Sequence, residues 1–162
     1  MRRYLSALLA CALALALYGC SIQEEDAAGV RVYCLETLAE GSSRLTYNRL
    51  ALPEGATREE RSALITAAVV KPESDRYFSA LPEGMDPTLT HQGVVLRVDF
   101  DAGFETLAET EKSLAVAALC LSLLEQSDVS FIYISAGGKS QPPFYDQPIS
   151  RSSFLTEEDT FR

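Results

Sequence analysis

The sequence predicts an α+β domain in which two helices lie on one face of a mixed sheet, with the elements in the order ββαββαβ. Two pairs of runs alternate apolar with polar side chains across a turn, which is typical of hairpins. Two further runs place apolar residues at helical spacing, and a last run of β-branched and aromatic residues is typical of a buried strand. The chain has 162 residues, of which 47% are hydrophobic, so it is long enough for one core and too short for two large domains.

The first 19 residues predict a lipoprotein signal peptide. Arg2 and Arg3 precede an Ala/Leu-rich run that is shorter than the roughly 20 residues that span a membrane. Leu17-Tyr18-Gly19-Cys20 is similar to the bacterial lipobox, except that Tyr18 stands where a small residue is usual. We therefore expect Cys20 to carry a lipid that holds the chain on the extracytoplasmic face of the cell membrane, with residues 20–29 as a polar linker. The alternative is an ordinary secretory signal.

The first hairpin and the first helix follow the linker. Alternation over Val30–Leu35 and β-type residues over Leu45–Leu52 predict the two strands. A helix is predicted over Arg58–Val70, because Thr57 and Glu60 have capping-box spacing and Pro72 prevents its continuation. The apolar stripe expected to face the core is Leu64, Ile65, Ala68 and Val69.

The second hairpin is predicted from Pro87–His91 and Val94–Phe100 around the turn Gln92-Gly93. Side chains of a strand alternate between its two faces. Val94, Leu96, Val98 and Phe100 are therefore expected to be buried, while Val95, Arg97 and Asp99 lie on a largely wet face.

A second helix is predicted over Glu111–Gln126 with Thr110 as its N-cap. Its expected core stripe is Leu114, Ala117, Ala118, Leu121 and Leu124. The last strand is predicted over Val129–Ile134, with at most one further edge strand near Ile149. The domain is thus expected to span residues 30–150, and residues 151–162 to form a polar tail.

The charge balance argues against nucleic acid as a partner. The chain has 14 Lys and Arg against 23 Asp and Glu, a formal net charge of −9. Proteins that bind nucleic acid neutralise phosphates with clustered basic side chains. Such a basic footprint is missing from this composition.

Six motifs follow one another in an order that resembles a known family. They are Val30-Arg-Val-Tyr33, a helix ending in Lys71-Pro72, Ser79–Gly84, Gly93–Asp99, Thr110–Leu114, and Val129–Ile134 followed by Gly137-Gly138. Together they look like a GerMN domain, the sporulation and spore-germination domain of extracytoplasmic lipoproteins, over about residues 28–150. The resemblance implies a fold similar to the ring-building motif of secretion and sporulation-channel proteins, and a module that binds proteins and is not an enzyme.

Three patterns were weighed for chemistry, and each favours a structural role. Gly137-Gly138-Lys139-Ser140 ends like a phosphate-binding loop, but Tyr133 replaces the first glycine and Pro142 follows where a helix is needed. His91 is interpreted as a solvated turn residue rather than a catalytic base. Asp99, Asp101 and Glu105 lack the spacing of a calcium loop, so we expect neither a metal ion nor a cofactor.

The two cysteines of the predicted domain, Cys34 and Cys120, are interpreted as buried small hydrophobic residues. A disulfide between them remains open, because spacing alone does not decide whether two thiols meet.

Two hypotheses for function follow. The first is a membrane-anchored, non-catalytic module that binds or assembles proteins in sporulation, germination or the cell envelope. Its expected contact surface is the half-wet sheet face with Tyr33, Val95, Arg97 and Asp99, and its expected partner is an envelope protein, with homo-oligomers left open. The alternative is a lipoprotein that binds a small ligand or a cell-wall glycan.

We predict that Cys20→Ser releases the chain from the membrane or blocks its processing, because the lipid attaches to that thiol. The measurement is incorporation of a labelled fatty acid, together with fractionation. Cys11 lies inside the predicted signal, so the Cys11→Ser chain should incorporate the label normally. Equal labelling of the Cys20→Ser chain would contradict the prediction.

Overall fold

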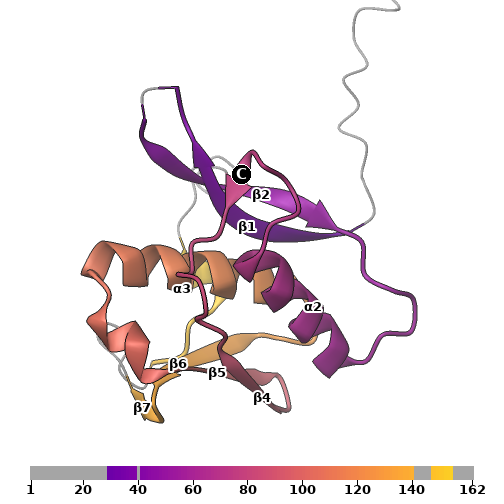
Figure 1. Cartoon of the computed structure of the whole chain (residues 1–162). Coiled ribbons are helices and arrows are strands. Elements are labelled where there is room, and N and C mark those ends of the chain that lie inside the picture. Colours follow the sequence, from indigo (N-terminus) through magenta and orange to yellow (C-terminus); the bar gives the residue numbers. More distant parts are fainter. Residues whose placement is uncertain (1–28, 40, 141–146, 155–162) are drawn as a thin grey trace, which may run out of the picture.

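The computed structural model describes residues 29–39, 41–140 and 147–154. Cys20, nearly all of the predicted linker and the last eight residues of the predicted tail lie outside this part of the chain. The helices α2 (Arg58–Val70) and α3 (Glu109–Leu123) lie between the two sheets of the domain, so that the described residues form three layers (Figure 1). In the part of the chain described, no helix is long and apolar enough to cross a membrane.

The first sheet has three antiparallel strands in the order β2-β1-β3. The long hairpin β1 (Val30–Thr37) and β2 (Ser43–Leu50) confirms the first predicted hairpin. β3 (Tyr77–Phe78) is a two-residue strand on the other side of β1 that the sequence did not indicate.

The second sheet has four strands in the order β4-β5-β6-β7. β4 (Thr88–Gln92) and β5 (Val95–Phe100) form the second predicted hairpin, but its turn is Gly93-Val94 and Val94 is 52% exposed, so the expected burial of Val94 was wrong. β5 lies parallel to β6 (Phe131–Ala136). β7 (Lys139–Ser140) returns antiparallel along β6. The sheet is mixed because its central pair, β5 and β6, is parallel and its two outer pairs are antiparallel. Beyond β7, Ile149 forms an isolated antiparallel bridge with Ile132, in agreement with the edge pairing expected there.

The predicted order ββαββαβ is present, with the short strands β3 and β7 added to it. The mixed second sheet carries both helices on one face, as expected (Figure 1). The first hairpin does not join this sheet. It forms a separate sheet that covers the opposite side of the helices, where Val32 belongs to the shared core.

α2 (Arg58–Val70) has the predicted bounds. The Thr57 hydroxyl accepts from the Glu60 N–H at 3.2 Å, and the Glu60 carboxylate accepts from the Thr57 N–H at 2.8 Å. Ile65 and Val69 are fully buried, but Leu64 is 40% exposed, so its place in the predicted core stripe was wrong. The buried face instead includes two polar residues at matching spacing, Ser62 and Thr66.

α3 (Glu109–Leu123) begins two residues before the predicted start and ends three before the predicted end. Its N-cap is Ala108, whose N–H donates to Glu111 at 3.0 Å, so Thr110 is not the cap. Of the predicted stripe, Ala118, Leu121 and Leu124 are buried, whereas Leu114 and Ala117 are partly exposed. The residues with no exposure also include Ala115, Val116, Leu119 and Leu123. A single stripe fails because a helix that is apolar all round is buried on most sides.

Two short 3-10 turns complete the described chain. η1 (Ala102–Thr106) follows β5 and carries Phe104, which stacks on Phe100 with ring centroids 4.3 Å apart. η2 (Arg151–Ser153) lies within the segment predicted as a tail, and the next residue, Phe154, packs partly against the core.

Of the four cysteines in the sequence, the structure describes Cys34 and Cys120, and both are free and buried. No disulfide joins them in this structure, and both thiols pack as small apolar groups. Burial raises the pKa of each thiol, which keeps it protonated and weakly nucleophilic.

A buried carboxylate joins β1 to the segment before β3. The Glu36 side chain is 6% exposed, and it pairs with Arg44 of β2 at 2.7 Å and with Arg76. Hydrogen bonds from Arg44 and then from Arg76 lower the pKa of Glu36 below its ordinary value of 4.5. The ionised form is therefore favoured in the folded chain.

Leu119→Ala is expected to destabilise the fold by roughly 2–5 kcal/mol, because it leaves a cavity at a fully buried position between the layers. Leu64→Ala, at an exposed position of α2, should cost no more than about 1 kcal/mol. Urea unfolding of both variants measures the difference. Equal midpoints would show that α3 is not buried as described.

Glu36→Gln should destabilise the chain most above pH 4.5, the ordinary pKa of the carboxyl. Because the folded-state pKa is depressed, the stability that ionised Glu36 contributes is present above that value and lost as the pH falls through the folded pKa. The difference in unfolding free energy between wild type and Glu36→Gln should therefore shrink on acidification. Glu83→Gln, at an exposed turn, should show a difference that is small at every pH.

Candidate functional site

The predicted contact residues do not form one surface. Val95, Arg97 and Asp99 lie on β5 in the second sheet, whereas Tyr33 lies on β1 in the first sheet. The helix layer separates the two sheets (Figure 1). The backbone N–H of Tyr33 donates instead to Ser122 of α3 at 2.8 Å, which ties the first sheet to the helix.

The face of the second sheet that points away from the helices, here the outer sheet face, brings together Val95, Arg97, Phe131 and Tyr133. Val95 pairs with Phe131, and Arg97 pairs with Tyr133 across the parallel strands. The Arg97 guanidinium lies 5.5 Å from the centre of the Tyr133 ring, and its Nε–H donates to Gln92 at 3.2 Å. Phe131 is 40% exposed, so this face presents an aromatic side chain and a cation together.

Asp99, the third predicted contact on β5, is engaged within the fold. Its Oδ1 accepts from the Ser135 hydroxyl at 2.5 Å and from the Gly138 N–H at 2.9 Å. Gly137 and Gly138 both have positive φ, 56° and 73°, as a tight turn between antiparallel strands requires. The Gly137–Ser140 motif is therefore a turn into β7. The N–H groups of Gly137 and Gly138 donate to Phe100 and Asp99 of β5.

Asp101, like Asp99, is engaged within the fold. Asp101 accepts from the Gly103 N–H at 2.7 Å and caps η1. Across the residues that the structure describes, no group of three or more His, Cys, Asp or Glu side chains gathers to hold a metal ion.

His91 lies on β4 and is partly buried, so its interpretation as a solvated turn residue was wrong. Its Nε2 is 3.0 Å from the Ser62 hydroxyl, which accepts from the Gln126 amide at 3.0 Å. Burial, followed by the charge of Arg58, lowers the pKa of His91. The lowered pKa favours a neutral ring, and the hydrogen bonds of Ser62 with His91 and Gln126 join α2, β4 and the segment after α3.

The Ser62 and His91 pair has the composition of a nucleophile and its base, but Ser62 is 0% exposed. A serine that no substrate reaches does not act as a nucleophile. Nearby, Asp128 pairs with Arg61 at 2.6 Å and with Arg58 at 3.5 Å. These contacts fix the start of α2 against the loop before β6.

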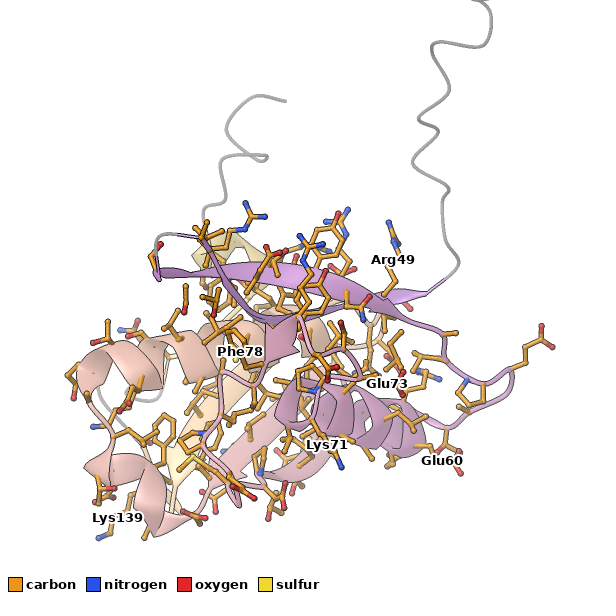
Figure 2. All side chains as sticks on the ribbon, turned by 45° about the horizontal axis from the view of Figure 1, so that its top comes forward. Arg49, Glu60, Lys71, Glu73, Phe78 and Lys139 are labelled. Carbon is orange, nitrogen blue, oxygen red and sulfur yellow. The ribbon has the colours of Figure 1, made fainter. Side chains whose placement is uncertain are left out.

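A groove lies between α2 and β4 and encloses about 540 Å³. One wall is α2, whose end at Lys71 and whose start near Glu60 are labelled in Figure 2; the other is the segment that leads into and includes β4. The lining residues are Glu59, Ala63, Thr66, Ala67, Val70 and Lys71 on the helix side, and Asp86, Pro87, Leu89 and His91 on the strand side. Thr66 is 9% exposed, and within the described chain neither Thr66 Oγ1 nor His91 Nδ1 has a hydrogen-bond partner.

Solved structures share this architecture. The first GerMN domain of the sporulation protein GerM from Bacillus subtilis matches over 82% of this chain and 99% of that one, with a TM-score of 0.57 at 13% identity. The tandem GerMN domains of the same protein match over 82% of this chain and 47% of that one, with a TM-score of 0.51 at 13% identity. The chain has a GerMN-like fold.

A candidate lipoprotein from Clostridium perfringens is a further structural match, at 10% identity and a TM-score of 0.47, over 76% of this chain and 87% of that one. The GerMN-like chain spans about half of the tandem GerM structure. No family model matches the sequence, and no curated protein matches it. The likeness at these identities is therefore one of fold.

Sequence reasoning missed two features of the GerMN-like domain. Phe131 and Tyr133 were within a predicted strand, but their position beside Val95 and Arg97 depends on parallel pairing between β5 and β6. The groove depends on the contact between residues 59–71 and 86–91, which no local pattern indicates.

Proposed function

We propose that this chain is a lipoprotein held on the extracytoplasmic face of the cell membrane, and that its GerMN-like domain binds an envelope protein without catalysing a reaction. The observation that carries the proposal is the outer sheet face. Aromatic residues and Arg are enriched where proteins bind each other. Here exposed Phe131 and Arg97, which lies over Tyr133, share one surface.

The buried polar chain supports a binding role over a catalytic one. Ser62 is closed off from solvent and bonded on both sides, to His91 and to Gln126. Such a chain stabilises the packing of three elements at once. It has no exposed nucleophile to offer a substrate.

The biological process is proposed as sporulation, germination or cell-envelope assembly. The fold neighbour from Bacillus subtilis is a domain of a sporulation protein. Membrane attachment through Cys20 is proposed from the lipobox-like sequence before it.

A second function, binding of a small ligand or a cell-wall glycan, is favoured by the groove. Its volume of about 540 Å³ falls within the range of about 300–1,000 Å³ of small-molecule sites. The two functions are distinguished by extracting the cross-linked chain from membranes in detergent and identifying any protein captured with it. A purified partner that binds again supports the first function, and binding of purified muropeptides without a protein partner supports the second.

Arg97→Ala should weaken the captured protein complex while changing the free energy of unfolding by no more than about 0.5 kcal/mol, since Arg97 is exposed and its local contacts are weak. Arg49→Ala is the matched control, because Arg49 is exposed on β2 of the other sheet (Figure 2). Titration of the purified partner against each full chain measures the effect. Equal affinity of all three chains would exclude the outer sheet face, and turnover of cell-wall or peptide substrates would contradict the non-catalytic role.

A further inference from the structure

The free edge of the second sheet is β4. Among the strands described, β4 pairs only with β5, whereas β6 is followed on its outer side by β7 and by the Ile149 bridge. The open edge of the first sheet, β2, carries Arg44 and Arg49, and charged side chains discourage pairing with another strand. β4 reads Thr-Leu-Thr-His-Gln and has no such charge.

The turn between β4 and β5 fixes which backbone groups of β4 point outward. Gln92 pairs with Val95 across a two-residue turn, and residues that flank such a turn exchange both backbone hydrogen bonds. Bonded pairs alternate along an antiparallel ladder, so Thr90 and Thr88 also bond to β5. Leu89 and His91 therefore direct their N–H and C=O groups away from the sheet.

The groove runs beside this free edge. Arg58 at the start of α2 donates to the carbonyl of Gly93, just beyond the end of β4, so the helix and the strand run in opposite directions. From Glu59 to Lys71 the helical wall is about 18 Å long at 1.5 Å per residue. An extended chain covers that length with about five residues.

The lining is suited to a peptide. Ala63 and Ala67 are exposed small residues on the helical wall, which leaves room for side chains from a neighbouring strand. Two acids, Glu59 and Asp86, face one base, Lys71, so the charge of the groove favours a basic ligand.

We propose that the groove binds an extended segment of a partner protein, which pairs with β4 as an added strand. Every second side chain of this segment is apolar and lies between α2 and β4. A basic residue of the segment lies toward Glu59. This mode of recognition combines main-chain hydrogen bonds with pockets for alternate side chains. The inference rests on the proposed protein-binding function and names the surface and the kind of segment.

Other occupants fit the charges less well. Each copy of this chain has a formal net charge of −9, and like charges oppose the association of two copies. The segments of this chain that adjoin the domain in sequence, 21–28 and 155–162, each contain three acidic residues. A basic segment of another protein matches the groove better than either.

The test uses the full chain in detergent and three fluorescent hexapeptides. The first alternates valine with threonine behind an N-terminal lysine, the second replaces its central valine with proline, and the third replaces its lysine with glutamate. The first should bind at concentrations up to about 1 mM and slow hydrogen exchange of the Leu89 and His91 amides, while Thr88 and Thr90 change little. The proline and glutamate peptides should each bind about tenfold more weakly, a difference of about 1.4 kcal/mol.

Matched variants locate the peptide. Ala67→Gln fills the helical wall and should weaken binding of the first peptide about tenfold, whereas Leu64→Gln on the same helix outside the groove should not. Glu59→Lys should reverse the preference between the lysine and glutamate peptides, and Glu83→Lys should leave it unchanged. Unaltered urea midpoints show that the variants fold. If a variant does not fold, the comparison of the first peptide with the proline peptide on the wild-type chain still tests strand addition.

Equal binding of the proline peptide, or no protection of Leu89 and His91 with any peptide, would overturn strand addition. Protection of these two amides without peptide, together with dimers in sedimentation, would overturn it in favour of a second copy. A captured envelope protein that binds the Ala67→Gln chain normally would also overturn it and leave the proposed function intact. If no envelope protein is captured while the peptides behave as expected, the proposed function fails and the groove stands as a peptide site.

Discussion

The burial of α3 between two sheets is the constraint on which the rest of the domain depends. Ala115, Val116, Leu119 and Leu123 have no exposure, and together they occupy more than one side of the helix. One sheet covers only one side, so the second sheet alone would leave apolar surface in water. The first hairpin covers the remainder. The Tyr33 N–H, bonded to Ser122, fixes it there, and the Ser122 hydroxyl in turn donates to the Ala118 carbonyl at 2.6 Å.

α2 is placed differently, and this difference creates the groove. Only its face with Ile65 and Val69 is fully buried, while Ala63 and Ala67 remain exposed. The chain of hydrogen bonds from Gln126 through Ser62 to His91 holds α2 beside the free edge of β4. Because hydrogen bonds between buried polar side chains favour one arrangement of the elements that carry them, the position of the groove follows from the packing of three elements. The lowered pKa of His91 agrees with this role, since a neutral imidazole is less costly to bury than a charged one.

Local signals predicted the elements well, and long-range pairing accounts for what they missed. The capping box of Thr57 and Glu60 and the breaker Pro72 mark α2 from residues close in sequence, so its bounds were found. The stripe predicted on α3 includes three buried residues but misses most of the buried surface, because periodicity detects contrast between faces and this helix has little. Tyr33 and Val95 were grouped because both alternate in strands, but alternation does not say which sheet a strand joins. The groove and the outer sheet face arise from contacts between distant segments, so their geometry could not be read from either segment alone.

The two candidate surfaces are adjacent because β4 borders both. Leu89 and His91 face the groove, whereas Thr88, Thr90 and Gln92 are exposed on the opposite side of the strand. Gln92 also accepts from Arg97, which connects the edge strand to the outer sheet face. In the proposed strand addition, alternate side chains of the partner segment enter the groove, and those between them extend the outer sheet face beside Thr90. A partner that contacts Arg97 and Phe131 would then approach the same edge that the added strand occupies. Recognition through the sheet face and through the free edge would thus be two parts of one interface.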